Sequence, residues 1–240
     1  HGPTALIAEA CDSGAFDYVN LHWYYIRQDN GPALDAARRQ DMGVFIISPT
    51  DKGGHLHTPS QRLLELCAPL HPIVFNDLFC LQDPRVHTIS VGAARPEDLE
   101  LHLEALRLLP EAASLIAPVD QRLRQAADEA LGRDWMATWS VGLPPWHATP
   151  GEINLPVLLW LYNLLEAWDL ESYAKARYGL LGSGGHWFAG ANADGFDAEV
   201  SAEELQSVLQ ESPWRKRIPE ILRSLKQRLK GESQMRLSSV

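Results

Sequence analysis

The stretch HTISVGAARPEDLE, residues 87–100, passes from a strand pattern to a helix pattern through a turn of small residues. Residues 86–91 are rich in β-branched side chains and predict a strand. Pro96 then opens a segment that predicts an amphipathic helix over residues 96–109. Its apolar face is expected to carry Leu99, Leu103 and Leu106. Strand, tight turn and helix in this order form the unit from which parallel α/β folds are built.

The turn between this strand and this helix has the features of an anion site. The first N–H groups of a helix have no partner within the helix and carry partial positive charge. Gly92 and Ala93 leave room for a ligand oxygen, and Arg95 can offer a bidentate guanidinium. The alternative is a plain helix start with a surface arginine, in which Glu97 and Asp98 only complement the helix dipole.

A second strand and loop, GVFIISPTDKGG, cover residues 43–54. The near-continuous apolar run at residues 43–48 predicts a strand that is buried on both faces and ends at Ser48. Pro49 makes the exit rigid, Lys52 presents an ammonium group, and Gly53 allows tight turning. In α/β barrels the loops after the last two strands frequently bind phosphate. The alternative for this loop is an ordinary exposed turn.

The same alternation of strand and helix runs through the first 110 or so residues. We expect a strand at residues 16–23, helices at residues 4–11 and 32–40, and a further helix with Thr58 as its N-cap and Pro59 at its first position. Residues 71–75 are expected to be a short extended piece. Alternation predicts parallel strands joined by crossover helices. Because three strands cannot close a barrel, the unit is expected to be incomplete.

After Pro110 the pattern is helical only, and it predicts an all-α second part. The expected helices cover residues 119–131, 156–168, 170–181 and 219–230, with another beginning at Ser201. Ser201 and Glu204 form a capping-box pattern. Residues 135–156 are expected to be a loop, residues 182–195 a glycine-rich connection, and residues 231–240 a frayed tail.

Composition narrows the functional classes. The formal net charge is −10, which disfavours broad contact with nucleic acid, since such contact needs a basic face. No apolar run approaches the ~18 residues of a membrane span. The scattered, odd-numbered cysteines Cys11, Cys67 and Cys80 predict reduced thiols in a cytoplasmic protein. The first residues, HGPTALIAEA, indicate either a processed N-terminus or, as we favour, the C-terminal part of a longer protein.

Other reactive side chains offer weaker sites. His55 and His57 are the best-spaced histidine pair, but a zinc site needs at least three protein ligands, so we expect no metal site. His186 with Trp187 is interpreted as structural. Cys80 has no basic partner near it in sequence, which disfavours a nucleophilic role.

The two strand-loop segments carry a resemblance to a known family. GVFIISPTDKGG followed by ISVGAARPEDLE resembles the last two strand-loop units of the aldo/keto reductase family, and FDYVNLHWYYI, residues 16–26, is similar to the preceding strand. The match covers roughly residues 1–110. It implies an α/β fold that is the C-terminal part of a TIM (β/α)8 barrel, with NADP(H) as cofactor and a small carbonyl compound as substrate.

The resemblance also implies which residues hold NADPH. The loop after one strand covers the cofactor pyrophosphate, the turn after the last strand holds the adenosine phosphate, and an Asn or Gln on the earlier strand contacts the nicotinamide carboxamide. The matching residues are Asn20, Ser48, Pro49, Lys52, Gly53, Gly92, Ala93 and Arg95. Arg95 favours NADPH over NADH.

Several positions depart from the family pattern. Ile47 stands where an aromatic ring often stacks on the nicotinamide, and His102 and Leu101 stand where an Asn and a Glu often contact adenine. The family's catalytic residues belong to earlier strands. The resemblance therefore implies a chain with cofactor-binding residues, no catalytic acid–base group and no activity by itself.

The second part resembles the ferredoxin-like helical domain that one branch of these reductases carries. TPGEINLP, residues 149–156, is similar to the end of a cluster-binding run, yet Leu143, Trp146 and Thr149 stand at cysteine positions. Iron–sulfur clusters need thiolate ligands, so we expect the fold without a cluster. Tryptophan packing is expected to replace it, through Trp135, Trp139, Trp146 and Trp160. The expected domains are residues 1–115 and 116–240.

A second functional hypothesis remains open. The lost cysteines and the departures at Ile47, Leu101 and His102 also suit a nucleotide-binding or scaffold protein that uses a reductase fold without turnover. Residues on the earlier strands distinguish the two hypotheses. A Tyr and a Lys at the expected strand ends favour an enzyme.

Overall fold

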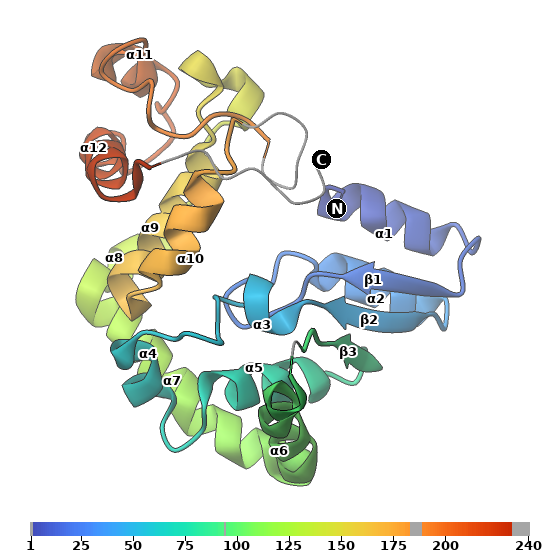
Figure 1. Cartoon of the computed structure of the whole chain (residues 1–240). Helices are drawn as coiled ribbons and strands as arrows, with labels where there is room; N and C mark the ends of the chain where they lie inside the picture. Colours follow the sequence, from blue (N-terminus) through green and yellow to red (C-terminus); the bar gives the residue numbers. More distant parts are fainter. Residues whose placement is uncertain (1, 94, 183–188, 232–240) are drawn as a thin grey trace. The chain divides into compact units, whose positions relative to one another are not determined.

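A computed structural model describes residues 2–93, 95–182 and 189–231 (Figure 1). The chain divides into two compact units, His1–Arg124 and Gln125–Val240. The boundary falls within the long helix α7, Ala112–Leu131.

The first unit contains a parallel three-stranded sheet. Its strands are β1 (Tyr18–Leu21), β2 (Gly43–Ile47) and β3 (Thr88–Ser90), in the order β1-β2-β3. The register places Asn20 beside Phe45 and Phe45 beside Thr88. Both pairs of strands are parallel, which confirms the predicted mixed α/β class with parallel strands. Each strand is shorter than its sequence pattern, because the predicted ends are irregular backbone outside the ladder.

Helices connect and flank these strands. They are α1 (Thr4–Asp12), α2 (Gly31–Arg39), α3 (Pro49–Lys52), α4 (Gln61–Cys67), α5 (Pro72–Leu81), α6 (Glu100–Leu108) and α7, with 3₁₀ turns η1 (Pro96–Leu99) and η2 (Leu109–Glu111).

Two expectations about these helices were wrong. The N-cap of α4 is Ser60, whose Oγ accepts a hydrogen bond from the N–H of Leu63 at 3.1 Å, and not Thr58. Residues 71–75 are not extended but begin α5, where His71 Nδ1 accepts from the N–H of Ile73 at 3.2 Å. Pro72 at the first helical position needs no N–H partner, which favours a helix start there.

The two faces of the sheet have different surroundings. Leu21, Val44 and Ile46 are buried in a core that also contains side chains of α1, α2 and α5. The opposite face exposes Tyr18 by 60% and Phe45 by 37%, and their rings meet edge to face at 5.5 Å between centroids. The prediction that residues 43–48 are buried on both faces was therefore wrong, because Phe45 is exposed on this second, uncovered face of β2.

The expected apolar face of the helix at residues 96–109 also differs. Leu99, Leu103 and Leu106 are exposed, whereas His102 and Ala105 are buried. The helix turns this way because His102 pairs with Asp77 of α5. A buried polar contact and a small alanine thus define the packed side of α6.

The second unit is helical in its described part. Its helices are α8 (Arg133–Thr138), α9 (Leu155–Trp168), α10 (Glu171–Tyr178), α11 (Ala202–Ser207) and α12 (Ile218–Leu229), with 3₁₀ turns η3 (Trp146–Ala148) and η4 (Pro150–Glu152). Here β contacts among the described residues are isolated bridges only. The capping box of Ser201 and Glu204 is confirmed, with the N–H of Glu204 donating to Ser201 Oγ at 3.2 Å. α8 lies partly inside the predicted loop at residues 135–156.

Trp135 is central to this unit. Its side chain is fully buried, and its indole N–H donates to Asn163 Oδ1 at 2.6 Å. The ring of Trp214 lies 5.2 Å from it. The other tryptophans expected to pack with Trp135, namely Trp139, Trp146 and Trp160, are each partly exposed. Of these, Trp160 contacts Tyr173 at 6.0 Å between ring centroids.

Some expectations lie outside the described residues. His186 and Trp187 belong to the segment 183–188, and the expected frayed tail belongs to residues 232–240. Among the residues that the structure describes, no single helix has the length and hydropathy to cross a membrane. The bent pair α4 and α5 reaches that threshold only when both helices are counted together.

Candidate functional site

The two predicted phosphate loops leave the sheet side by side. Ile47 and Ser90 are register partners at the carboxyl ends of β2 and β3. One residue further on, the N–H of Ser48 donates to the carbonyl of Ser90 at 3.0 Å. The loop at residues 48–54 and the turn at residues 91–95 therefore start from adjacent positions on one edge of the sheet.

The loop after β2 has a fixed backbone. Ser48 adopts a left-handed conformation with φ 52° and ψ 47° and is the N-cap of the short helix α3. Pro49 is buried, and its carbonyl accepts a hydrogen bond from Asn76 Nδ2 of α5 at 3.1 Å. A Cβ on Gly53 would lie 1.9 Å from that same carbonyl oxygen. Glycine is thus required at this position by the loop's own backbone.

Two polar residues of α3, Thr50 and Lys52, are at least partly buried. Lys52, at the end of the helix, is partly buried. Thr50 is buried, and its Oγ1 has no hydrogen-bond partner among the described residues. Lys52 is thus at the end of α3 opposite to Ser48, and its role as a phosphate ligand stays a prediction.

The turn after β3 is open. Gly92 and Ala93 are exposed, and a Cβ on Gly92 would meet no atom within 4 Å. Neither residue's N–H donates to another described residue. The Arg95 side chain is 74% exposed and pairs with Asp98 at 3.0 Å, while the backbone N–H of Arg95 donates to the same carboxylate at 3.0 Å. An anion at this turn has to compete with Asp98 for the guanidinium.

The end of β1 carries a hydrogen-bond chain that the sequence patterns did not indicate. His22 Nδ1 lies 2.7 Å from the hydroxyl of Tyr24, and that hydroxyl donates to the carbonyl of Ile47. Because the single Tyr24 proton is used on Ile47, His22 must donate from Nδ1. Asn30 Nδ2 donates in turn to the carbonyl of His22 at 2.9 Å. This chain ties the end of β1 to the end of β2.

Asn20, the predicted nicotinamide contact, is exposed on the uncovered face of the sheet, in register with Phe45. His102, which aligns with an adenine-contacting position of the resembled family, is only 7% exposed and pairs with Asp77. The structure thus places Ser48 beside Ser90, just before the turn that contains Gly92, whereas it holds His102 inside the helical layer.

Metal ligands do not gather in the described residues. No group of three or more His, Cys, Asp or Glu side chains among them is arranged to hold a metal ion. His55 lies 3.5 Å from Asp51, and His57 is exposed.

Comparison with known proteins adds no assignment. No protein-family model, no curated protein and no solved structure matches this chain. The fold and site define a mixed α/β protein in which two loops leave adjacent ends of a parallel sheet. A functional assignment for this chain therefore rests on its own residues and their geometry.

Proposed function

We propose that this chain is part of an NADP(H)-dependent, aldo/keto reductase-like oxidoreductase that reduces a carbonyl compound, and that its first unit is the C-terminal part of a (β/α)8 barrel. The observation that carries the proposal is the 3.0 Å hydrogen bond from Ser48 N–H to the Ser90 carbonyl. This hydrogen bond joins two neighbouring strand ends. A loop follows each of these ends, and the two loops carry the cations Lys52 and Arg95. In α/β proteins ligands bind at the carboxyl ends of the strands.

The uncovered face of the sheet supports the barrel. Each strand of a barrel turns alternate side chains inward. On β1 the exposed Tyr18 and Asn20 alternate with less exposed residues. On β2 the exposed Phe45 lies between the buried Val44 and Ile46. In the proposed barrel these exposed side chains face the interior.

The donor set fits the phosphates of the cofactor. The amides of Gly92 and Ala93 have no partner among the described residues, and Gly92 has no side chain to obstruct an approaching oxygen. Backbone amides at a helix start bind phosphate oxygens well. Arg95 would pair with the adenosine phosphate, and Ser48 with Lys52 would face the pyrophosphate. Pro49 and Gly53 keep their loop in shape, and Asn20 would contact the carboxamide.

Bound NADPH supplies the hydride. The residues of this chain then bind and orient the cofactor, and the acid–base group belongs to another part of the proposed barrel. The chain by itself is expected to bind the cofactor without turning over a carbonyl substrate.

Titration of the chain with NADPH, NADH and adenosine 2′,5′-bisphosphate tests the proposal, with calorimetry as the readout. Arg95→Ala is expected to weaken NADPH binding about tenfold and NADH binding much less, because only NADPH offers the extra phosphate. Arg107→Ala, an exposed arginine further along α6, is the matched control and should leave both affinities unchanged. Equal losses for NADPH and NADH, or no binding of any probe, contradict the proposal.

A further inference from the structure

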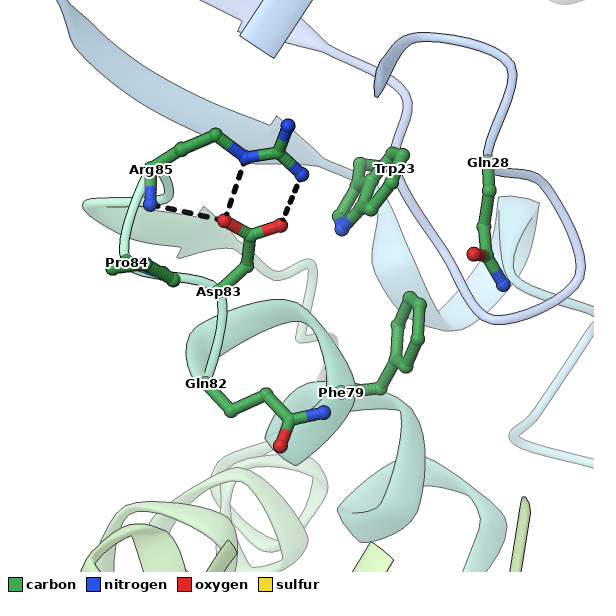
Figure 2. A pocket seen from close by; sticks show the side chains of 7 residues that line it. All are labelled: Trp23, Gln28, Phe79, Gln82, Asp83, Pro84 and Arg85. Atoms are coloured by element: carbon green, nitrogen blue, oxygen red, sulfur yellow. Dashed lines mark hydrogen bonds and ion pairs between the residues drawn. The ribbon is translucent and has the colours of Figure 1, made fainter. Parts of the chain in front are cut away.

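A hollow of about 350 Å³ lies between the segment that follows β1 and the C-terminal end of α5 (Figure 2). Trp23 and Gln28 line it from the first segment, and Phe79, Gln82 and Pro84 from the second. A volume of this size is at the lower end of the range for small-molecule sites. None of the residues predicted to bind the cofactor lines it.

The indole of Trp23 gives this hollow an unused hydrogen-bond donor. Trp23 is only 8% exposed, and its Nε1 has no hydrogen-bond partner among the described residues. A buried donor without a partner loses the free energy of its hydration, and the N–H of a buried tryptophan usually finds an acceptor. In Figure 2 the nitrogen edge of the Trp23 ring points into the space between Asp83 and Phe79. An acceptor on a ligand would satisfy this N–H.

The walls favour a flat ligand. The rings of Trp23 and Phe79 are nearly parallel, with an interplanar angle of 21° and centroids 6.0 Å apart. Phe79 is partly exposed, so a ring can be packed against it from the hollow. Pro84 adds apolar surface on the other side. Flat aromatic surfaces gain most from contact with another flat ring.

Two side-chain amides give the rim both donors and acceptors. Gln28 Nε2 donates to the carbonyl of Tyr25 at 2.8 Å, which leaves its Oε1 as an acceptor. The side chain of Gln82 is exposed and lies on the rim of the hollow. Amide groups recognise a carbonyl next to an N–H, because they supply the complementary donor and acceptor.

The arginine that lines the hollow is already paired with carboxylates. The Arg85 guanidinium is held by Asp83 at 2.6 Å and by Asp35 at 2.7 Å. Although burial raises the pKa of Asp83, hydrogen bonds from Arg85 outweigh it and hold this pKa below its ordinary value. Two carboxylates hold this one guanidinium, so it is not available for a phosphate.

From these features we propose that the hollow binds a neutral, flat heterocycle with a carbonyl acceptor beside an N–H donor, as in a free nucleobase. The acceptor receives the Trp23 N–H, the ring lies against Phe79, and the amide of Gln82 pairs with the polar edge. This site is separate from the proposed cofactor site, and neither proposal depends on the other.

Uracil is the test ligand, and 1,3-dimethyluracil and orotate are its comparisons. The first comparison lacks the N–H donors, and the second adds a carboxylate. Calorimetric titration of the whole chain is expected to show uracil binding with a Kd of about 1 mM or below. Dimethyluracil is expected to bind at least about threefold more weakly, because the glutamine acceptor loses its partner. Orotate is expected to bind more weakly still, since Asp35 and Asp83 already hold the Arg85 guanidinium that its carboxylate would need.

Variants identify the site. Trp23→Phe keeps a ring but removes the N–H, and Gln82→Leu removes the amide from an exposed position; each is expected to weaken uracil binding about three- to tenfold. Gln227→Leu, at an exposed glutamine of α12, is the matched control for the second change. Uracil binding that both variants leave unchanged, orotate binding as tightly as uracil, or no uracil binding up to its solubility overturns the proposal. NADPH affinity should not change in Gln82→Leu, which separates this test from that of the cofactor site.

Discussion

His102 of α6 and Asp77 of α5 form a hydrogen-bonded pair in which both side chains are buried, with exposures of 7% and 1%. Burial raises the pKa of Asp77, and the hydrogen bond and charge of His102 lower it by less. The net effect is a pKa above the ordinary value of 3.8. The folded state therefore disfavours the ionised form of this carboxyl group.

We predict that Asp77→Asn makes the protein more stable near neutral pH. A raised pKa means that the stabilising contribution of this carboxyl is fully present below 3.8 and is lost as the pH rises through the folded-state value. Asparagine keeps an acceptor for His102 and has no charge to bury. Urea denaturation should show a gain of about 1 kcal/mol near pH 7 that disappears near pH 3. A variant that is less stable than the parent near pH 7 would contradict this reasoning.

Asp83→Asn is the control, because the pKa of Asp83 is shifted in the opposite direction to that of Asp77. Burial raises the pKa of Asp83, but the hydrogen bonds from Arg85 lower it by more, so the net shift is downward. The ionised Asp83 carboxylate therefore stabilises the fold above the ordinary pKa of 3.8. This contribution is lost as the pH falls through the lower pKa of the folded state. This variant should lose stability near pH 7 and approach the parent at acid pH.

Two glycines in the proposed cofactor loops should differ in how they tolerate a side chain. Gly53→Ala should destabilise the protein by about 2 kcal/mol or more, because its Cβ would lie 1.9 Å from the Pro49 carbonyl oxygen. Gly92→Ala should change the free energy of unfolding by no more than about 0.5 kcal/mol, since its Cβ enters open space. Thermal denaturation measures both. Equal effects of the two substitutions are the result that would refute the prediction.

The pair formed by Arg95 and Asp98 leads to a third prediction. Asp98→Asn keeps an oxygen for the backbone N–H of Arg95 but removes the charge that holds its guanidinium at 3.0 Å. If Arg95 binds the adenosine phosphate, adenosine 2′,5′-bisphosphate should bind about threefold more tightly. Glu97→Gln removes an exposed charge one position away, and it should have a smaller effect because solvent screens that charge. Weaker binding by Asp98→Asn would show that Arg95 is not a phosphate ligand.

The cysteines give a fourth prediction. Cys11, Cys67 and Cys80 are all buried, and burial raises the pKa of Cys67 to about 12. Burial also raises the pKa of Cys80 well above 9.0. Because the thiolate is the reactive form, a disulfide reagent near pH 8 should not react with the native protein within minutes. The denatured chain should react at all three positions. Rapid labelling of the native protein would show that its thiols are accessible.

Local patterns predicted much of this architecture. The strand–turn–helix at residues 87–100 and the run at residues 43–48 appear as β3 with α6 and as β2. Those patterns depend on side-chain spacing and on proline and glycine, which act locally. The helix start at Ser201 was predicted for the same reason.

The expectations failed where a short pattern was ambiguous or where a contact came from a distant part of the chain. α5 was expected to begin as an extended piece, because an apolar run as short as residues 71–75 fits a strand as well as a buried helix. The rotation of α6 could not be predicted, since it follows from the contact between His102 and Asp77. The hollow beside Trp23 combines residues from two distant segments and left no motif in the sequence.

The exposure of Leu99, Leu103 and Leu106 has a consequence for the order in which the fold opens. A helix that buries few apolar side chains is released at a lower free energy than its neighbours. α6 is attached mainly through His102 and Ala105, whereas almost all of α5 is buried. In amide hydrogen exchange, the backbone of α6 should therefore exchange deuterium well before that of α5, as a separate early event.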